Sequence, residues 1–124
     1  ELGKPSRFCA TRFEDLKGEH FELVINATAS SLEGQTPPVP VSVVNGATVC
    51  YDMMYGPSET AFVAWGRRLG ARRWVDGLGM LVEQAAESFY IWRGVRPQTG
   101  PVLHELRAEM AIKTPLGQVD SFRK

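Results

Sequence analysis

The sequence predicts an α/β fold in which a small parallel sheet is flanked by helices. Two compact apolar runs, at 21–25 and 47–51, have the length and composition of strands that are buried in such a sheet. Helical patterns follow at 60–69 and 80–92, and a third short strand is expected between them at 73–75. Strands that alternate with helices in this way join through right-handed crossovers, which place parallel strands side by side.

The first expected strand and its flanks show how the sequence marks each element. The run at 21–25 (Phe-Glu-Leu-Val-Ile) is expected to be buried on both faces, and it stops at the polar Asn26. The stretch 30–40 contains one glycine and three prolines, which forbid a regular helix or a central strand, so we expect a loop there. Weaker signals indicate a short strand at 7–10 and one helical turn at 13–16.

Start and stop signals support the expected helices. Thr60 can cap the helix at 60–69, and Gly70 can end it. The helix at 80–92 has the strongest pattern, because apolar residues recur at helical spacing along one side. A further short amphipathic helix is expected at 102–110.

The expected organisation is a single domain at 1–112 followed by a weakly patterned tail at 113–124. At the other end, Glu1-Leu2-Gly3 resembles the last turn of a helix with Gly3 as its C-cap. Because a helix does not begin at its own end, we expect the sequence to be a fragment of a longer protein.

Composition removes several classes of function. The 14 basic and 14 acidic residues give a formal net charge of zero, so no electrostatic argument favours nucleic-acid or anionic-membrane binding. No apolar run approaches the roughly 20 residues of a membrane span. Cys9 and Cys50 lie in apolar, strand-like runs without metal-ligand spacing, so no metal site is expected. A reducing cytoplasm fits this composition.

The residues that follow the three strands carry the candidate chemistry. In parallel sheets ligands bind outside the carboxyl ends of the strands. We therefore expect three segments, which we call the rim, to converge on one edge of the sheet. They are 26–30, 52–55 and 76–79.

Each rim segment has a functional and a structural interpretation. The segment 26–30 offers small residues and hydroxyls, as a nucleotide phosphate or ribose requires, or it is an ordinary strand exit with an Asx turn. Met53 could lie against a flat ring and Tyr55 could direct a hydroxyl at a substrate, or both could cover the end of the core. Gly77 and Gly79 could leave room for a ligand above a helix N-terminus, or form a tight turn that needs positive φ.

Gln84 is an unusual polar residue among apolar neighbours on the second turn of the helix at 80–92. If its amide is buried it needs hydrogen-bond partners, since an unpaired one would cost about 1–3 kcal/mol. A polar substrate or a structural partner could satisfy it.

Three longer runs occur in one order and at suitable separations. They are Val-Ile-Asn-Ala-Thr at 24–28, Tyr-Asp-Met-Met-Tyr-Gly at 51–56, and Asp-Gly-Leu-Gly-Met-Leu-Val-Glu-Gln-Ala-Ala at 76–86. Together they closely resemble the C-terminal half of shikimate dehydrogenases, and Trp-Arg-Gly-Val-Arg-Pro at 92–97 resembles the family's usual continuation. The resemblance covers roughly 13–110 of the chain. It implies the C-terminal half of a Rossmann-like dinucleotide-binding domain, in an NADP-dependent oxidoreductase that reduces 3-dehydroshikimate to shikimate.

The resemblance also implies roles for individual residues. Met53 matches a residue beside the nicotinamide, and Tyr55 and Gln84 match residues that bind hydroxyl or carboxylate groups of shikimate. The segment after Thr28 departs from the family's more frequent Ser-Ala-Gly or Ser-Ser-Gly. The residues expected to contact the cofactor are Asn26, Ala27, Thr28, Ala29, Ser30, Met53, Gly77, Met80 and Leu81.

Other implied parts of the enzyme match nothing in this chain. The family's catalytic Lys and Asp belong to an N-terminal substrate domain, so we expect no catalytic residue here and no dehydrogenase activity from the isolated chain. The expected partners are that domain, NADP, and shikimate or 3-dehydroshikimate. In a competing interpretation the chain is a non-catalytic nucleotide-binding or self-associating module, and an unpaired sheet edge would favour a homodimer.

Overall fold

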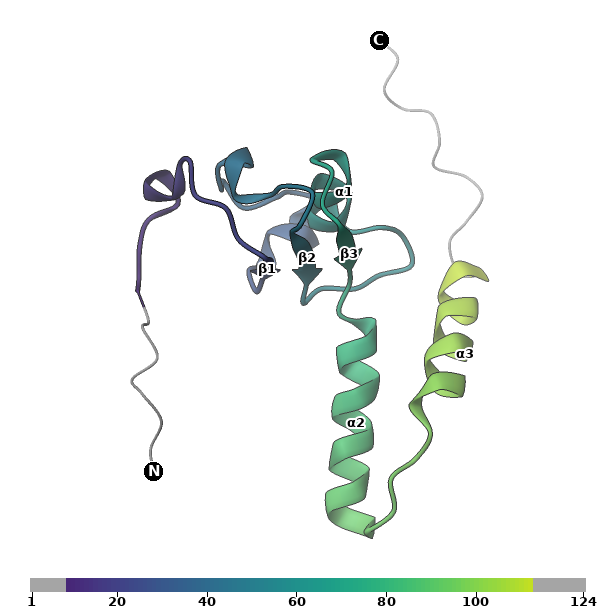
Figure 1. Ribbon diagram of the computed structural model, residues 1–124. Helices are drawn as coiled ribbons and strands as arrows, with labels where there is room; N and C mark the ends of the chain where they lie inside the picture. Colours follow the sequence, from purple (N-terminus) through teal and green to yellow (C-terminus); the bar gives the residue numbers. More distant parts are fainter. Residues whose placement is uncertain (1–8, 113–124) are drawn as a thin grey trace, which may run out of the picture.

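The computed structural model describes residues 9–112, in which a three-stranded parallel sheet is joined to two long helices that extend away from it (Figure 1). In chain order the elements are η1 (Phe13–Leu16), β1 (Leu23–Asn26), η2 (Ala29–Glu33), η3 (Val41–Val43), β2 (Val49–Asp52), α1 (Ala61–Arg68), β3 (Arg73–Val75), α2 (Leu78–Arg93) and α3 (Thr99–Ile112).

The sheet has the order β1-β2-β3, with β2 in the centre. Leu23 is the register partner of Val49, which in turn is the partner of Arg73, so the three strands start level with one another. All pairs are parallel, as the alternation of strands and helices predicts. The carboxyl ends of the strands consequently lie together at one edge of the sheet.

The principal core lies between α1 and the sheet. Phe62 and Trp65 stack with ring centroids 5.2 Å apart, and both side chains are buried. Gly66 faces Cys50 so closely that an added Cβ would lie 2.7 Å from the Cys50 sulfur. The helix therefore approaches β2 more closely than any larger residue at that position would permit. As predicted, the Thr60 side chain caps α1, accepting the N–H of Val63.

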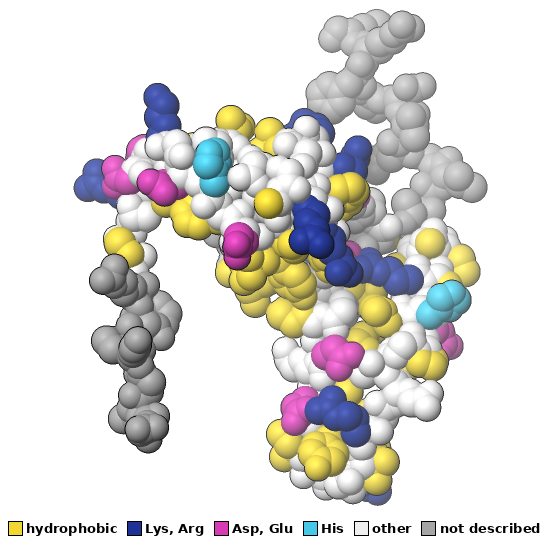
Figure 2. All heavy atoms as spheres, viewed as in Figure 1, with side chains coloured by type: hydrophobic (Ala, Val, Ile, Leu, Met, Phe, Trp, Pro, Cys, Tyr) yellow, Lys and Arg dark blue, Asp and Glu magenta, His cyan; other side chains and the backbone are white. Residues whose placement is uncertain are grey.

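The two long helices form a separate layer. α2 starts directly after β3 and runs away from the sheet, and α3 returns along its side (Figure 1). Leu78, Val82 and Ala86 are the buried residues of α2, whereas no residue of α3 is buried. Figure 2 shows hydrophobic side chains gathered below the sheet and again at the far end of this helical pair.

The predicted α/β fold is confirmed, with shifts at the element boundaries. β1 and β2 each begin two residues later than expected and end one residue later, and α2 begins at Leu78. Leu78 and Gly79 consequently belong to the first turn of α2 and not to the turn before it, because the Leu78 side chain is an anchor that is only 1% exposed. α3 begins at Thr99, three residues before the predicted start.

The structure differs from the predictions for β1, for the stretch 30–40 and for Cys9. β1 is not buried on both faces, since Leu23 and Ile25 are 53% and 54% exposed on the side that no described residue covers. The stretch 30–40 is not loop throughout, because η2 reaches Glu33 before the prolines begin. Cys9 is exposed and lies outside any strand.

Some predictions concern residues that are not described. The rest of the expected strand at 7–10, the helical turn at 1–3 and the tail at 113–124 all lie outside 9–112. Within that range no helix has the length and apolar character needed to cross a membrane, and no cluster of His, Cys, Asp or Glu is suited to hold a metal ion.

Candidate functional site at the carboxyl edge of the sheet

Direct main-chain contacts join the three rim segments. Asn26 and Asp52 are register partners at the ends of β1 and β2, and the Met53 N–H donates to the Asn26 carbonyl over 2.9 Å. One residue further on, the Met54 carbonyl accepts the N–H of Gly77 over 3.0 Å. The segments after all three strands therefore meet at one edge, which confirms the convergence predicted from the sequence.

Asp52 is the centre of a buried hydrogen-bond network. Its side chain is 0% exposed, and each of its two carboxylate oxygens accepts two hydrogen bonds. Oδ1 accepts from the Asn26 side-chain amide and the Met54 N–H, each over 3.1 Å. Oδ2 accepts from the hydroxyls of Ser31 and Thr60 over 2.7 and 2.6 Å. Four donors thereby offset the cost of burying the carboxylate.

The amide of Asn26 is saturated by protein groups. Its Oδ1 accepts the N–H and the hydroxyl of Thr28 over 3.1 and 2.7 Å, which forms the Asx turn considered as a structural alternative. Its Nδ2 donates to Ser31 and to Asp52 over 3.2 and 3.1 Å. A primary amide has two donor hydrogens and two acceptor lone pairs, so no capacity is left for a ligand. The group that Asn26 sets in place is Thr28, which is exposed and whose hydroxyl also pairs with Ser30 over 2.6 Å.

Position 77 requires glycine because the main chain of Met53 lies close to it, and not because of its φ angle. Its φ is −78°, so the interpretation as a turn that needs positive φ is wrong at this position. An added Cβ would lie 2.7 Å from the carbonyl carbon of Met53 and would overlap the carbonyl oxygen. The segment before α2 therefore packs main chain against main chain with the exit of β2.

Several predicted ligand-binding side chains, on the rim and on α2, are exposed to solvent. Met53 and Tyr55 are 39% and 41% exposed, and Leu81 on the first turn of α2 is 38% exposed. Met80 is partly buried. Gln84 is exposed, so its amide is not a buried group in need of internal partners, and no described residue hydrogen-bonds to that amide. The ligand-binding roles of these side chains stay predictions.

An ion pair ties α3 to the start of α2. The Arg107 guanidinium forms two hydrogen bonds with the carboxylate of Asp76, one of them 2.6 Å long. This bidentate contact raises the pKa of Arg107, mainly through the hydrogen bond. Asp76 also accepts the Leu78 N–H over 3.2 Å, so one carboxylate contacts the first N–H of α2 and holds α3.

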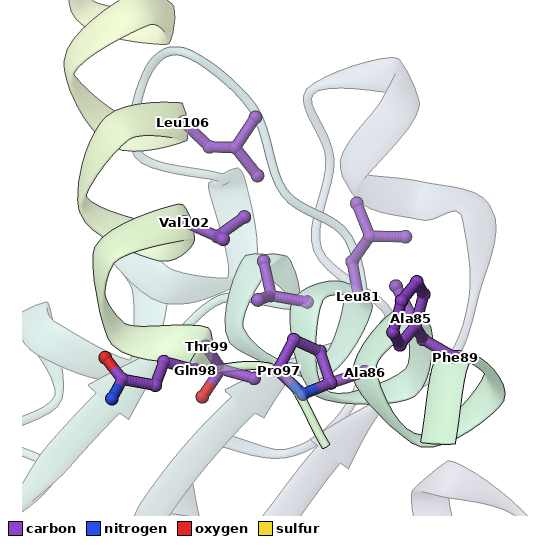
Figure 3. Close-up of a pocket in the computed structure, with 10 residues that line it drawn as sticks. Leu81, Ala85, Ala86, Phe89, Pro97, Gln98, Thr99, Val102 and Leu106 are labelled. Carbon is purple, nitrogen blue, oxygen red and sulfur yellow. The ribbon is translucent and has the colours of Figure 1, made fainter. Parts of the chain in front are cut away.

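A groove of about 300 Å³ lies between α2 and α3, and its walls are almost entirely apolar. Figure 3 shows Val102 and Leu106 of α3 directed toward α2, whose side of the groove includes Leu81 and Phe89. Pro97 lies at the end where the chain turns between the helices (Figure 3). Leu81 thus borders both this groove and the rim.

Sequence reasoning did not identify Asp52, Ser31 or Thr60 as one functional unit. Their contacts join residues 21 and 8 positions apart, so no local pattern reveals them. The available signal was a charged residue at the end of an apolar strand, which demands donors from elsewhere in the fold.

The chain matches the family model described as Shikimate 5'-dehydrogenase C-terminal domain over residues 77–107. It is 54% identical over 98 residues to a protein named shikimate dehydrogenase (NADP(+)) from Nitrosospira multiformis, and the match covers 79% of this chain and 36% of that relative. The chain therefore spans little more than a third of the length of that relative.

Two solved structures have the same fold. The Ael1 enzyme from Pseudomonas putida matches with a TM-score of 0.72 at 46% identity, which covers 77% of this chain and 35% of that one. A shikimate dehydrogenase solved in complex with NADP+ matches with a TM-score of 0.62 at 29% identity, over 77% of this chain and 33% of the other.

The parallel sheet, its helices and the edge where the strand exits meet define part of a Rossmann-like α/β domain, the class in which ligands bind at the carboxyl ends of the strands. Within that class, the matched relatives identify the family. The chain belongs to the shikimate dehydrogenases and corresponds to their C-terminal part.

Proposed function

We propose that this chain forms the cofactor-facing, C-terminal part of an NADP-dependent shikimate dehydrogenase, which interconverts 3-dehydroshikimate and shikimate. The observation that carries the proposal is the main-chain contact of Gly77 with Met53 and Met54, which brings the exits of β2 and β3 together. The relatives that match this chain are named as NADP(+) enzymes, and one structural neighbour was solved with NADP+.

The exposed residues of the rim fit the groups that such an enzyme binds. The main chain at 27–30 carries small side chains, so a ribose or phosphate can approach it closely. The half-exposed thioether of Met53 offers an apolar, polarizable surface to the flat nicotinamide ring, with Met80 and Leu81 closing over that end of the cofactor. These contacts would orient the cofactor from one side.

Two polar side chains are proposed to hold the substrate. The Tyr55 hydroxyl can donate or accept, and the free amide of Gln84 can do both at once, which suits the hydroxyl and carboxylate groups of a cyclic hydroxy acid. When bound, the nicotinamide of NADP+ would supply the acceptor for a hydride from the alcohol carbon of shikimate. The transfer needs substrate and nicotinamide within near-attack distance and a group that takes the hydroxyl proton.

No residue of this chain is proposed as that proton acceptor. The family resemblance places the catalytic Lys and Asp in an N-terminal substrate domain, so the 124-residue chain by itself is expected to show no turnover and at best weak NADPH binding. A cytoplasmic location is part of the same proposal and agrees with the free cysteines Cys9 and Cys50.

One observation favours the second candidate, a self-associating module. β1 is an edge strand among the described residues, and Leu23 and Ile25 on its open face are more than half exposed. Unpaired strand edges with apolar side chains promote pairing between chains. This candidate predicts a homodimer whose formation does not depend on NADP.

The test is a chimera in which this chain replaces the matching C-terminal part of the Nitrosospira multiformis enzyme. We expect the chimera to oxidise shikimate with NADP+. In the chimera, Tyr55→Phe and Gln84→Met should each lower kcat/KM for shikimate roughly 2- to 12-fold, the equivalent of about 0.5–1.5 kcal/mol for one lost hydrogen bond.

The matched control is Ser88→Ala on the same helix as Gln84. It removes a hydroxyl whose one hydrogen bond within residues 9–112 is to the Gln84 carbonyl. It should leave kcat/KM unchanged. A chimera that is folded but neither binds NADP+ nor turns over shikimate would contradict the proposed function.

A further inference from the structure

We infer that Asp52 is a positioning residue that sets the shape of the rim, and through it the affinity for the nicotinamide cofactor, without touching the ligand itself. The inference rests on the proposed function, because it concerns the same edge of the sheet. Asp52 is 0% exposed, so its carboxylate acts only through the groups that donate to it.

Those groups come from three separate parts of the chain. Asn26 and Ser31 bracket the segment after β1, the Met54 N–H belongs to the segment after β2, and Thr60 is the N-cap of α1. One side chain therefore links two rim segments to the start of α1. No other described side chain is hydrogen-bonded to all three parts.

The direction of each hydrogen bond is fixed by its neighbours. The Ser31 hydroxyl accepts from the Asn26 amide, and the Thr60 hydroxyl accepts from the Val63 N–H, so each must give its proton to Asp52 Oδ2. Oδ2 must therefore accept twice, which a carboxylate oxygen does and an amide NH₂ cannot.

Asp52 is connected to the predicted cofactor contacts through two hydrogen-bond paths. Asp52 holds the Asn26 amide in the orientation that accepts the N–H and hydroxyl of Thr28. It also holds the Met54 N–H, and the Met54 carbonyl accepts from Gly77. Thr28, Met53 and Gly77, which are the predicted contacts to the cofactor, are thus arranged by one buried carboxylate.

The experiment uses the 124-residue chain with Asp52→Asn, which keeps the size of the side chain but replaces Oδ2 with a donor. In the chimera, which is expected to bind the cofactor, the same substitution should raise the NADP+ dissociation constant at least tenfold. In the 124-residue chain we also expect faster hydrogen exchange at the amides of Thr28, Met54 and Gly77, measured by nuclear magnetic resonance. The amide of the buried Ala71, which donates to the Gly66 carbonyl, should not change.

Two controls separate positioning from general loss of stability. Val43→Ala removes buried volume from the core near the amino end of β1, where the Val43 carbonyl accepts the Phe21 N–H. It should lower the urea midpoint of unfolding but leave NADP+ affinity unchanged. Thr60→Ser keeps the hydroxyl and should bind as the unaltered chimera does, whereas Thr60→Val should follow Asp52→Asn.

The outcomes distinguish this inference from the proposed function. Asp52→Asn binding NADP+ as tightly as Val43→Ala would overturn the inference and leave the proposed function intact. If the unaltered chimera binds no NADP+, the exchange rates of the 124-residue chain decide, since unchanged rates at Thr28, Met54 and Gly77 in Asp52→Asn would overturn the inference by themselves. The chimera then decides the proposed function separately.

Discussion

Gly77 lies where the chain that leaves β3 crosses the chain that leaves β2, with its N–H bonded to Met54 and its Cα against the Met53 carbonyl. A contact between two main chains leaves no side chain that could move aside. Asp52 and Asn26 at the same edge are equally constrained, because their polar atoms are fully used. At this scale the rim is determined by backbone shape and buried polar groups.

Substituting the two glycines that flank Leu78 should therefore have opposite results. Gly77→Ala places a Cβ into the Met53 carbonyl, and overpacking of this kind costs about 1–3 kcal/mol. Gly79→Ala meets no atom within 4 Å inside a helix, where alanine is favoured over glycine by about 0.5–1 kcal/mol. Urea unfolding measures both, and equal midpoints for the two variants would contradict the expected clash.

The two thiols should differ in reactivity. Burial raises the pKa of the Cys50 thiol, whereas Cys9 is exposed. As pH rises through the ordinary thiol pKa, the unfolded chain releases a proton that the folded chain keeps at Cys50, so stability should fall with increasing pH in that range. A chromogenic disulfide reagent should label one thiol rapidly in the folded chain and both in urea. Rapid labelling of both in the folded chain would show that Cys50 is accessible.

Among the elements, those with strong local patterns could be predicted from the sequence. β1 and β2 were expected from apolar runs, and α1 from Thr60 and Gly70 at its ends. The start of α2 was misplaced by two residues, since two glycines hide a buried Leu78. The prediction that β1 is buried on both faces was also wrong, because burial depends on which elements cover a strand and not on the strand's own composition.

The contacts that complete the site could not be predicted for a related reason. The partners of Asp52 lie on three different segments, and the pairing of Arg107 with Asp76 spans 31 positions. Such contacts follow from the three-dimensional path of the chain. The convergence of the rim was predictable because parallel strands have only one carboxyl edge.

The ion pair at that edge should control how firmly α3 is held. Arg107→Gln removes the bidentate contact with Asp76, and α3 has no buried residue to compensate. Since Arg107 is 45% exposed, we expect a loss of global stability below about 1 kcal/mol. Hydrogen exchange across α3 should nevertheless accelerate while exchange in α1 stays constant. Glu105→Gln on the same helix is the control, and equal exchange in both variants would exclude this role.

Large hydrophobic side chains are exposed at two places among the described residues. Ile91, Trp92 and Val95 at the far end of the helical pair are 71%, 78% and 63% exposed, and the open face of β1 adds Leu23 and Ile25. Extended apolar surface of this kind marks contact with another protein surface.

Self-association through β1 makes a separate prediction at this scale. Ile25→Lys places a charge on the open face of the edge strand, where the exposed side chain contributes little to the core. In sedimentation velocity we expect the unaltered chain to show dimer or larger species at high concentration, and Ile25→Lys to be monomeric. Glu22→Gln, just before the strand, changes the net charge by the same amount and controls for charge alone. Identical sedimentation of all three chains would exclude pairing through this edge.

All hydrogen-bonding positions of the Asn26 amide are used, and each oxygen of the Asp52 carboxylate accepts two hydrogen bonds. These two residues therefore determine where the rim can be redesigned. Changing either residue disturbs several bonds at once, so a library built there would return mostly misfolded proteins. The side chains of Met53, Tyr55 and Gln84 are exposed and form no hydrogen bond with another described residue. The backbone at Met53 and Gln84 is held by other residues. If the proposed function holds, laboratory evolution of substrate preference should therefore begin by randomising these three codons.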